Sequence, residues 1–459
     1  MKGFKFVDLF SGLGGFHYAL KELGGECVFA SEIDPQLRAL YIKNHKFKKA
    51  LMYGDIAKSI DKVPPHDVLV AGFPCQPFSK SGKQLGFQDK SRGDCIFYIL
   101  DILERLKPKN FIFENVSNFA KHDEGKTWND VKSIIEKLGY CVRSTADVSS
   151  SIDKSNFHLS PHHFGYPQKR ERFFAVGSLN YLPKNPFPIP NEIKPSLKKI
   201  ILSKKQLEKL NDKKIDIDNC KISKQATDAI NLWNQFIDCL PNKNKDLPSS
   251  FPLWLEEYYS DFPYAINTPY QEMLDKGYST ELINKKLNNL PPYARENVSQ
   301  FPLWKIKFLD NNRMWFMEYK PFISKEIVDQ IRTLDYTYRK LEWNFKQSNS
   351  ADIWDHTIQL RPSGLRVSNP DYVPTIVSLN TSQRPIYGPI RRHLTAKEIT
   401  RAFGFPRSIK LLGNHILDTK ALGNTVHKDL VKLIAEKLLK YDNLSVIKNI
   451  NIDKEKVPA

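Results

Sequence analysis

The chain lacks the features that mark membrane proteins, disulfide-stapled proteins and zinc proteins. It has no apolar run of about 18 residues, which a membrane-spanning helix would need. Its 6 cysteines include no Cys-x-x-Cys pair, so we expect no disulfide framework, no metal site and a reducing compartment. The amino terminus runs directly into an apolar stretch and leaves no room for a signal peptide. These absences favour a cytoplasmic protein.

Acidic residues are scarce relative to basic ones. Lys and Arg number 69 against 51 Asp and Glu, which gives a formal net charge of +18. An excess of this size favours an anionic partner such as nucleic acid. The excess is spread along the chain and does not locate a binding groove, and a solubilising Lys-rich surface would give the same net charge.

Strand and helix signals alternate over the first part of the chain. This order predicts an α/β fold with a mainly parallel sheet and helices on both of its faces. The expected strands are residues 4–9, 26–31, 68–71, 110–114 and 173–176, and the expected helices are residues 17–23, 35–44, 95–106 and 128–138.

The regular pattern stops near Leu182, where a proline-rich linker begins. The following stretch to residue 390 has no strand–helix rhythm and is rich in Lys, Asn, Trp and Tyr. Regular helices are expected again over residues 395–403 and 429–439, before a polar tail at 441–459. A chain of 459 residues is too long for one compact core, so we expect a second, irregular domain in the middle.

The most informative stretch is Gly-Phe-Pro-Cys-Gln-Pro-Phe-Ser at residues 72–79. It places Cys75 between two prolines, just after an apolar strand. A thiol at the carboxyl end of a strand lies where open α/β sheets bind their ligands. A buried cysteine acting as a small hydrophobe is the alternative for any single thiol, but the stiffened loop favours a nucleophile.

These eight residues resemble the catalytic motif of the DNA (cytosine-5)-methyltransferases. Four further blocks resemble motifs of that family, in the family's order: Asp8–Phe16, Phe113–Val116, Gln168–Arg172 and Gly423–Val426. The chain is therefore identified as a member of this family, of the bacterial restriction–modification type. The resemblance implies the Rossmann-like fold of S-adenosylmethionine-dependent methyltransferases. It also implies a catalytic and cofactor-binding domain at 1–180, a target-recognition domain at 181–390, and a segment at 391–440 that returns to the catalytic domain.

A glycine turn and two acidic residues indicate a cofactor site. The turn after the first strand is a weak signal alone, but Glu32 follows Gly12 by about twenty residues, where a carboxylate commonly binds ribose hydroxyls. The ordered set suggests an adenosine-containing cofactor, and the resemblance implies S-adenosylmethionine, with Phe10 and Asp55 at the adenine. Ile33 stands where relatives often place an aromatic residue. The resemblance adds three more cofactor-site residues, Gly14, Pro74 and Asn424.

The resemblance also implies how catalysis proceeds. The Cys75 thiolate would add to C6 of a cytosine that has left the base stack, and this makes C5 reactive. Glu114, at the end of an apolar strand, would hydrogen-bond N3 of the base. Arg170 and Arg172 share one face by strand alternation and would lie near the cytosine O2.

Two regions are expected to contact DNA. The stretch 79–93 has the glycines and basic side chains of a loop that closes on a phosphate backbone. Farther along, Gly364-Leu-Arg366 and Thr375-Ile376 resemble recognition-region patterns, although an ordinary hairpin with exposed arginines would look similar. The expected DNA-binding residues are Gln76, Ser79, Lys83, Arg92, Arg366 and Thr375.

The implied partner is duplex DNA, bound by a monomer, with any cognate restriction endonuclease acting separately. Two alternatives stay open. An RNA (tRNA) cytosine-5 methyltransferase of the same fold would have a much smaller middle segment. A non-catalytic DNA-binding homologue would be expected to lose Cys75, Glu114 or Arg172, all of which are present.

Overall fold

The structure is a computed structural model that describes residues 3–74, 95–147, 159–191, 193–209, 220–259, 274–287, 303–344, 350–361, 364–376 and 384–440. The chain divides into two compact units. The first unit comprises Met1–Ile215, Asp371–Thr381 and Thr395–Ala459, and the second comprises Asp216–Pro370 and Ser382–Leu394. The first unit is therefore built from both ends of the chain. No helix in the described ranges is long and apolar enough to cross a membrane.

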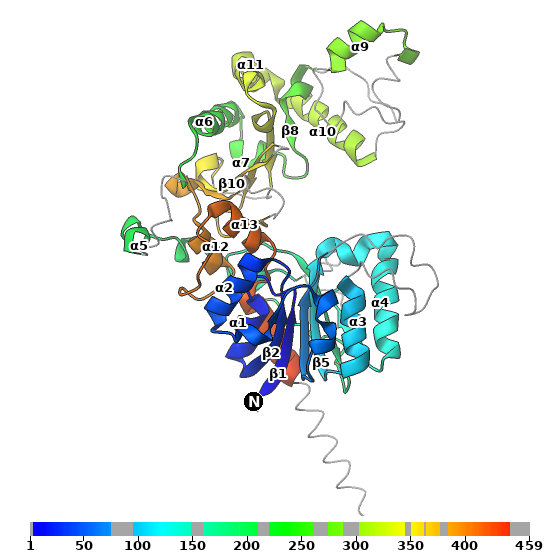
Figure 1. Ribbon diagram of the computed structural model, residues 1–459. Coiled ribbons are helices and arrows are strands. Elements are labelled where there is room, and N and C mark those ends of the chain that lie inside the picture. Colours follow the sequence, from blue (N-terminus) through cyan, green and yellow to red (C-terminus); the bar gives the residue numbers. More distant parts are fainter. Residues whose placement is uncertain are drawn as a thin grey trace, which may run out of the picture. The chain divides into compact units, whose positions relative to one another are not determined.

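The first unit contains a seven-stranded sheet of order β3-β2-β1-β4-β5-β7-β6 (Figure 1). Neighbouring strands from β3 to β5 are parallel, and β7 runs antiparallel to both β5 and β6. The strands are β1 (Phe4–Leu9), β2 (Gly25–Ser31), β3 (Met52–Tyr53), β4 (Val68–Gly72), β5 (Asn110–Val116), β6 (Cys141–Ser144) and β7 (Arg172–Ser178).

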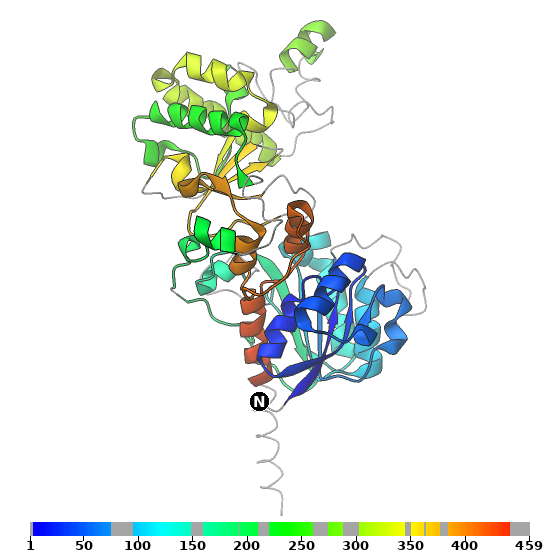
Figure 2. The ribbon, with the colours of Figure 1, turned by 60° about the vertical axis from the view of Figure 1, so that its left-hand side comes forward.

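Apolar side chains on both faces of this sheet hold helices against it. Because side chains alternate along a strand, Phe6 and Val70 enter one core while Val7 and Leu69 enter the other. The first core packs α1 (Gly15–Glu22), α2 (Pro35–His45) and the helix at 428–440. The second core packs α3 (Cys95–Leu106) and α4 (Lys126–Lys137) (Figures 1 and 2).

The first unit also contains α5 (Lys204–Lys209), α12 (Ala396–Ala402) and α13 (His415–Gly423). The start of α12 is fixed by a capping box, in which the Thr395 side chain binds the Glu398 amide and the Glu398 side chain binds the Thr395 amide. The other Glu398 carboxylate oxygen accepts the Leu202 amide. This contact ties the carboxyl-terminal part of the chain to the segment that follows β7.

The second unit contains a six-stranded sheet of order β13-β12-β10-β11-β9-β8. One face of this sheet packs on a core that includes side chains of α6 (Lys224–Asp238), α10 (Leu303–Tyr319) and α11 (Lys325–Thr333). Figure 2 shows helices of this unit beside its strands. The strands are β8 (Leu253–Trp254), β9 (Lys340–Trp343), β10 (Thr357–Arg361), β11 (Gly364–Ser368), β12 (Ile386–Tyr387) and β13 (Arg392–His393). The helices are α6 (Lys224–Asp238), α7 (Lys243–Asp246), α9 (Thr280–Leu287), α10 (Leu303–Tyr319) and α11 (Lys325–Thr333).

The structure confirms the expected α/β fold, with a mostly parallel sheet between two layers of helices. The sequence pattern did not predict the sheet of the second unit, because its strands are only 2 to 5 residues long. Such strands are too short to show a clear alternation. The first compact unit extends to Ile215 and takes in Asp371–Thr381. The polar tail at 441–459 lies outside the described residues.

Candidate active site

The carboxyl ends of the parallel strands bring the expected cofactor residues to one edge of the first sheet. Phe10 follows β1, Glu32 follows β2, Asp55 follows β3 and Pro74 follows β4. Open α/β sheets bind their ligands at this edge, because parallel strands all end there. Asn424 directly follows α13 and is exposed.

Glu32 is held in place by two backbone amides. Its Oε2 accepts the Gly12 N–H at 2.9 Å, and its Oε1 accepts the Asp34 N–H at 2.9 Å. The carboxylate therefore joins the glycine turn after β1 to the end of β2. Each oxygen keeps a further lone pair, so the group can still accept hydrogen bonds from hydroxyls.

The glycine turn needs glycine for two different reasons. Gly12 and Gly14 have φ of +52° and +78°, a region that disfavours side chains. A Cβ at Gly14 would lie 2.1 Å from Nε2 of His45, so the turn packs directly on α2. Among the described residues, no atom would lie within 4 Å of a Cβ at Gly12, so this part of the chain leaves open space beside it. Phe10 also has a positive φ, of 56°, and packs half-buried on the core under α3.

The remaining expected cofactor residues have separate local roles. Asp55 accepts the Ala57 amide at 3.0 Å and so begins the short 3-10 helix Ile56–Lys58. Ile33 is 73% exposed, which is unusual for a large aliphatic side chain. Pro74 is exposed and is the last residue described before the stretch 75–94.

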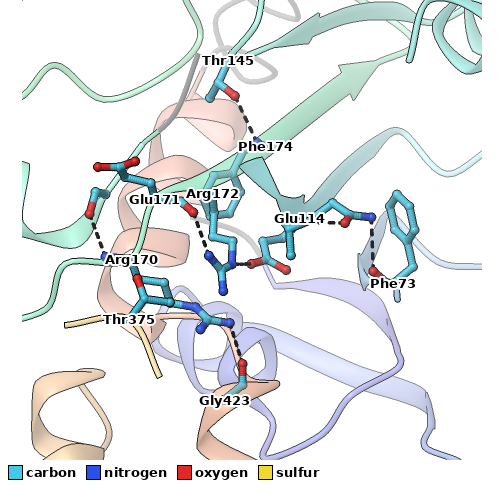
Figure 3. A network of polar contacts seen from close by, with 12 residues as sticks. Phe73, Glu114, Thr145, Arg170, Glu171, Arg172, Phe174, Thr375 and Gly423 are labelled. Atoms are coloured by element: carbon cyan, nitrogen blue, oxygen red, sulfur yellow. Dashed lines mark hydrogen bonds and ion pairs between the residues drawn. The ribbon is translucent and has the colours of Figure 1, made fainter. Parts of the chain in front are cut away.

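Glu114 and Arg172 form a buried ion pair on adjacent strands. Arg172 Nε lies 3.0 Å from Glu114 Oε1, and the two side chains are 13% and 10% exposed (Figure 3). The register pairs Arg172 with Val116, two positions after Glu114 on β5. Glu114 and Arg172 are therefore diagonal neighbours on one face of the sheet. Burial lowers the pKa of Arg172, and the negative charge of Glu114 opposes that shift.

Arg170 is more deeply buried than Arg172 and has a different main partner. Its Nη2 donates to the Gly423 carbonyl at 3.0 Å (Figure 3), and its guanidinium carbon lies 5.6 Å from the centre of the Phe403 ring. The pKa of Arg170 is lowered to about 9, mainly by burial and also by the nearby charge of Arg172, while Glu114 opposes the shift. The two arginines expected at one base therefore differ. Arg172 pairs with Glu114, while Arg170 binds the carboxyl-terminal segment.

Five of the expected site residues lie outside the described residues: Cys75, Gln76, Ser79, Lys83 and Arg92. The described chain nevertheless constrains where this stretch begins. Gly72, three positions before Cys75, is paired in register with Glu114. Asn115 Nδ2 donates to the Phe73 carbonyl at 3.2 Å, which ties the start of the stretch to β5 (Figure 3).

The two expected recognition residues fall in different units. Thr375 belongs to the first unit, where its hydroxyl donates to the Lys169 carbonyl at 2.8 Å. Arg366 belongs to β11 of the second unit, where its Nε lies 3.6 Å from a Glu342 carboxylate oxygen. We expected both residues to belong to one recognition segment, but they belong to two different compact units.

Sequence reasoning missed a buried polar cluster beneath the glycine turn. Tyr41 donates to Asp8 Oδ2 at 3.1 Å, and the Tyr41 hydroxyl lies 2.7 Å from Nδ1 of His17. Burial raises the pKa of Asp8 well above its ordinary value and lowers that of His17. The available signal was an acid between the apolar residues Val7 and Leu9 of β1. Within the described ranges, no group of three or more His, Cys, Asp or Glu side chains could hold a metal ion.

Comparison with known proteins places this arrangement in a family. Type II methyltransferase M.HhaI of Haemophilus parahaemolyticus is 41% identical over 213 residues, which are 46% of this chain and 60% of that protein. M.MspI of Moraxella sp is 39% identical over 44% of this chain and 44% of that protein. The chain thus spans about half the length of these two relatives. M.AluI of Cellulosimicrobium cellulans is 27% identical over 96% of this chain and 92% of that protein.

The family described as C-5 cytosine-specific DNA methylase matches residues 4–440, nearly the whole chain. The matched range includes both strands of the Glu114–Arg172 pair, the glycine turn and the Gly423 carbonyl that binds Arg170. This chain belongs to the C-5 cytosine-specific DNA methylases.

Proposed function

We propose that the protein is a sequence-specific DNA methyltransferase that transfers a methyl group from S-adenosylmethionine to C5 of a cytosine flipped out of duplex DNA. The observation that carries the proposal is the buried Glu114–Arg172 ion pair. Glu114 lies on β5, next to the strand that leads into Cys75, and Arg172 lies on β7, the neighbour of β5 on its other side. A carboxyl and a guanidinium side by side match the N3 and O2 edge of cytosine. Family membership supplies the reaction class.

The first unit has residues that suit the cofactor. Glu32 is oriented by two amides and can accept ribose hydroxyls, and the space beside Gly12 lets a ligand approach the backbone. We assign the adenine to Phe10, Ile33 and Asp55. The rest of the cofactor site is assigned to Gly14, Pro74 and Asn424. When bound, S-adenosylmethionine would supply an electrophilic methyl group.

In the proposed mechanism the protein's own groups activate the base. The Cys75 thiolate adds to C6 while Glu114, in its protonated form, donates its proton to N3, so that electron density builds up at C5. The proton returns from N3 to Glu114 when the ring is restored. Arg172, held by Glu114, hydrogen-bonds the cytosine O2. After C5 is methylated, a base removes the C5 proton and the bond from C6 to Cys75 breaks, which restores the aromatic ring and the free thiolate.

We further propose that the second unit recognises the DNA sequence and that the first unit binds the strand that carries the target cytosine. Arg366 of the second unit would contact a recognised base, and Thr375, although it belongs to the first unit, would also contact a recognised base or its sugar. The stretch with Gln76, Ser79, Lys83 and Arg92 would close on the flipped nucleotide and its phosphates. The protein would act in the cytoplasm as a monomer, and any restriction endonuclease of the same specificity would act separately.

A methyl-transfer assay tests the proposed function. Purified protein is incubated with methyl-tritiated S-adenosylmethionine and either unmethylated bacterial DNA or transfer RNA. We expect label in DNA only, and none with Cys75→Ser, because a hydroxyl is a far weaker nucleophile at neutral pH. Duplex DNA containing 5-fluorocytosine should trap the wild-type protein covalently, since fluorine blocks proton removal. Label in transfer RNA alone, or full turnover by the serine variant, would contradict the proposal.

A further inference from the structure

One face of the sheet in the second unit is charged. Because side chains alternate along β9, Leu341 and Trp343 enter the core while Lys340 and Glu342 point to the opposite face. The parallel register pairs Glu342 directly with Arg366 of β11. The face that carries Arg366 therefore also carries an acid, which the sequence pattern around Arg366 did not reveal.

Three cations share the Glu342 carboxylate. Lys340 Nζ lies 2.8 Å from Oε1, while Arg361 Nη1 and Arg366 Nε lie 3.4 Å and 3.6 Å from Oε2. The side chains of Lys340, Glu342, Arg361 and Arg366 are 12%, 18%, 26% and 26% exposed, so water screens them only partly. Together they carry a charge of +2. We call these four residues the Glu342 cluster.

Backbone geometry keeps the cluster tight. Gly364 starts β11 with φ of +137°, and a Cβ there would lie 2.8 Å from the Lys340 carbonyl oxygen and 2.9 Å from the Lys340 Cβ. Only glycine lets β9 approach so closely at this point. Lys340 is also positioned by the Trp254 ring, whose centre lies 4.7 Å from its Nζ. The cations are thus held by the strands rather than by long flexible loops.

Glu342 is charged at neutral pH. Burial by itself would raise the pKa of the Glu342 carboxyl, but the adjacent Lys340 and then the two arginines outweigh burial and hold that pKa below its ordinary value. Within the cluster, one carboxylate faces three cations. Cations on one face attract anions, and for a protein that modifies DNA the abundant anion is the phosphodiester backbone.

We propose that Glu342 is a specificity-determining residue: its carboxylate competes with DNA phosphates for Lys340, Arg361 and Arg366 and so weakens binding to DNA that lacks the recognition sequence. This inference rests on the proposed function, since it assumes that the second unit faces DNA. On non-cognate DNA, the three cations exchange the Glu342 carboxylate for a DNA phosphate and gain little binding free energy. On the recognition sequence, base contacts add to this exchange and decide the outcome.

The test compares Glu342→Gln with wild type in equilibrium binding to a fluorescent alternating dA·dT duplex. This duplex contains no cytosine and hence no target. Removing the carboxylate frees about one cation to bind a phosphate. The slope of log affinity against log salt concentration should therefore become more negative by about 0.9. Binding at 0.1 M salt should tighten by roughly fivefold to tenfold. In cells, base-resolution methylation maps should show added methylation at near-cognate sites.

Two control variants separate competition from general effects. Glu326→Gln makes the same charge change at an exposed position of α11 in the same unit, and it should leave binding nearly unchanged. Glu342→Asp keeps the charge and should keep the salt slope of the wild type. Equal effects of Glu342→Gln and Glu326→Gln, or weaker binding of Glu342→Gln to the dA·dT duplex, would overturn the proposal. The binding measurement needs no methyl transfer. A protein that methylates no DNA would therefore contradict the proposed function but would leave the comparison of Glu342→Gln with wild type still to be made.

Discussion

Arg170 Nη2 donates a hydrogen bond to the backbone carbonyl of Gly423 at 3.0 Å, across 253 positions of the chain. The contact joins the segment before β7 to the end of α13, and Asn424 follows directly. Arg170 is only 4% exposed, so this bond is made without competition from water. It is one of the contacts that build the first unit from both chain ends.

Arg170→Ala should destabilise the first unit. The change leaves the Gly423 carbonyl without its donor and opens space beside Phe403, which should cost about 2–4 kcal/mol. Urea denaturation followed by intrinsic fluorescence measures the loss. Lys169→Ala, one residue earlier and half-buried, is the matched control and should stay within about 0.5 kcal/mol of wild type. Equal stability of the two variants would show that the Arg170 contact is dispensable.

The Glu114–Arg172 pair should show strong energetic coupling. Removing either partner strands a buried charge, so Glu114→Ala and Arg172→Ala should each cost about 3–5 kcal/mol. The double variant should cost less than the sum by more than about 1 kcal/mol, as measured by urea denaturation of all four proteins.

The exposed pair of Asp101 and Arg105 on α3 is the reference for this cycle. Their nitrogen and oxygen lie 2.8 Å apart, close to the separation in the buried pair, but both side chains are 38% exposed. Water should reduce their coupling to about 0.3–0.5 kcal/mol. Similar coupling energies for the two pairs would mean that burial adds nothing to the Glu114–Arg172 interaction.

Glu32→Ala should weaken binding of S-adenosylmethionine more than binding of DNA. Loss of a charged acceptor should cost about 1.5–3 kcal/mol of cofactor affinity in calorimetric titrations. Glu32→Gln keeps one acceptor oxygen and should lose less. Unchanged cofactor affinity in the alanine variant would place the ribose elsewhere.

Arg366→Ala should relax the choice of DNA sequence. If Arg366 reads a base, discrimination at one position of the recognition site should fall by about 1–3 kcal/mol. Competition binding between cognate and singly altered duplexes measures this. A uniform loss over all duplexes, with a shallower salt dependence, would instead identify Arg366 as a phosphate contact. If neither the discrimination between duplexes nor the affinity for DNA changes, Arg366 of β11 takes no part in recognition.

The sequence alone predicted much of the local structure of the first unit, although not β3, β6, α5 or α13. The strand expected at residues 4–9 and the helix expected at 95–106 have the same bounds as β1 and α3. The period of their apolar residues is enough to identify them. The family was likewise readable from sequence, because its motifs are short, contiguous blocks.

Only the tertiary structure decided which distant residues act together. The ion pair of Glu114 with Arg172, the bond from Arg170 to Gly423 and the sharing of Glu342 by three cations all depend on strand register and chain return. No local pattern encodes these pairings, since each joins segments whose spacing in the sequence is arbitrary. Packing of whole elements sets the register, and the register then selects the partner of each charge.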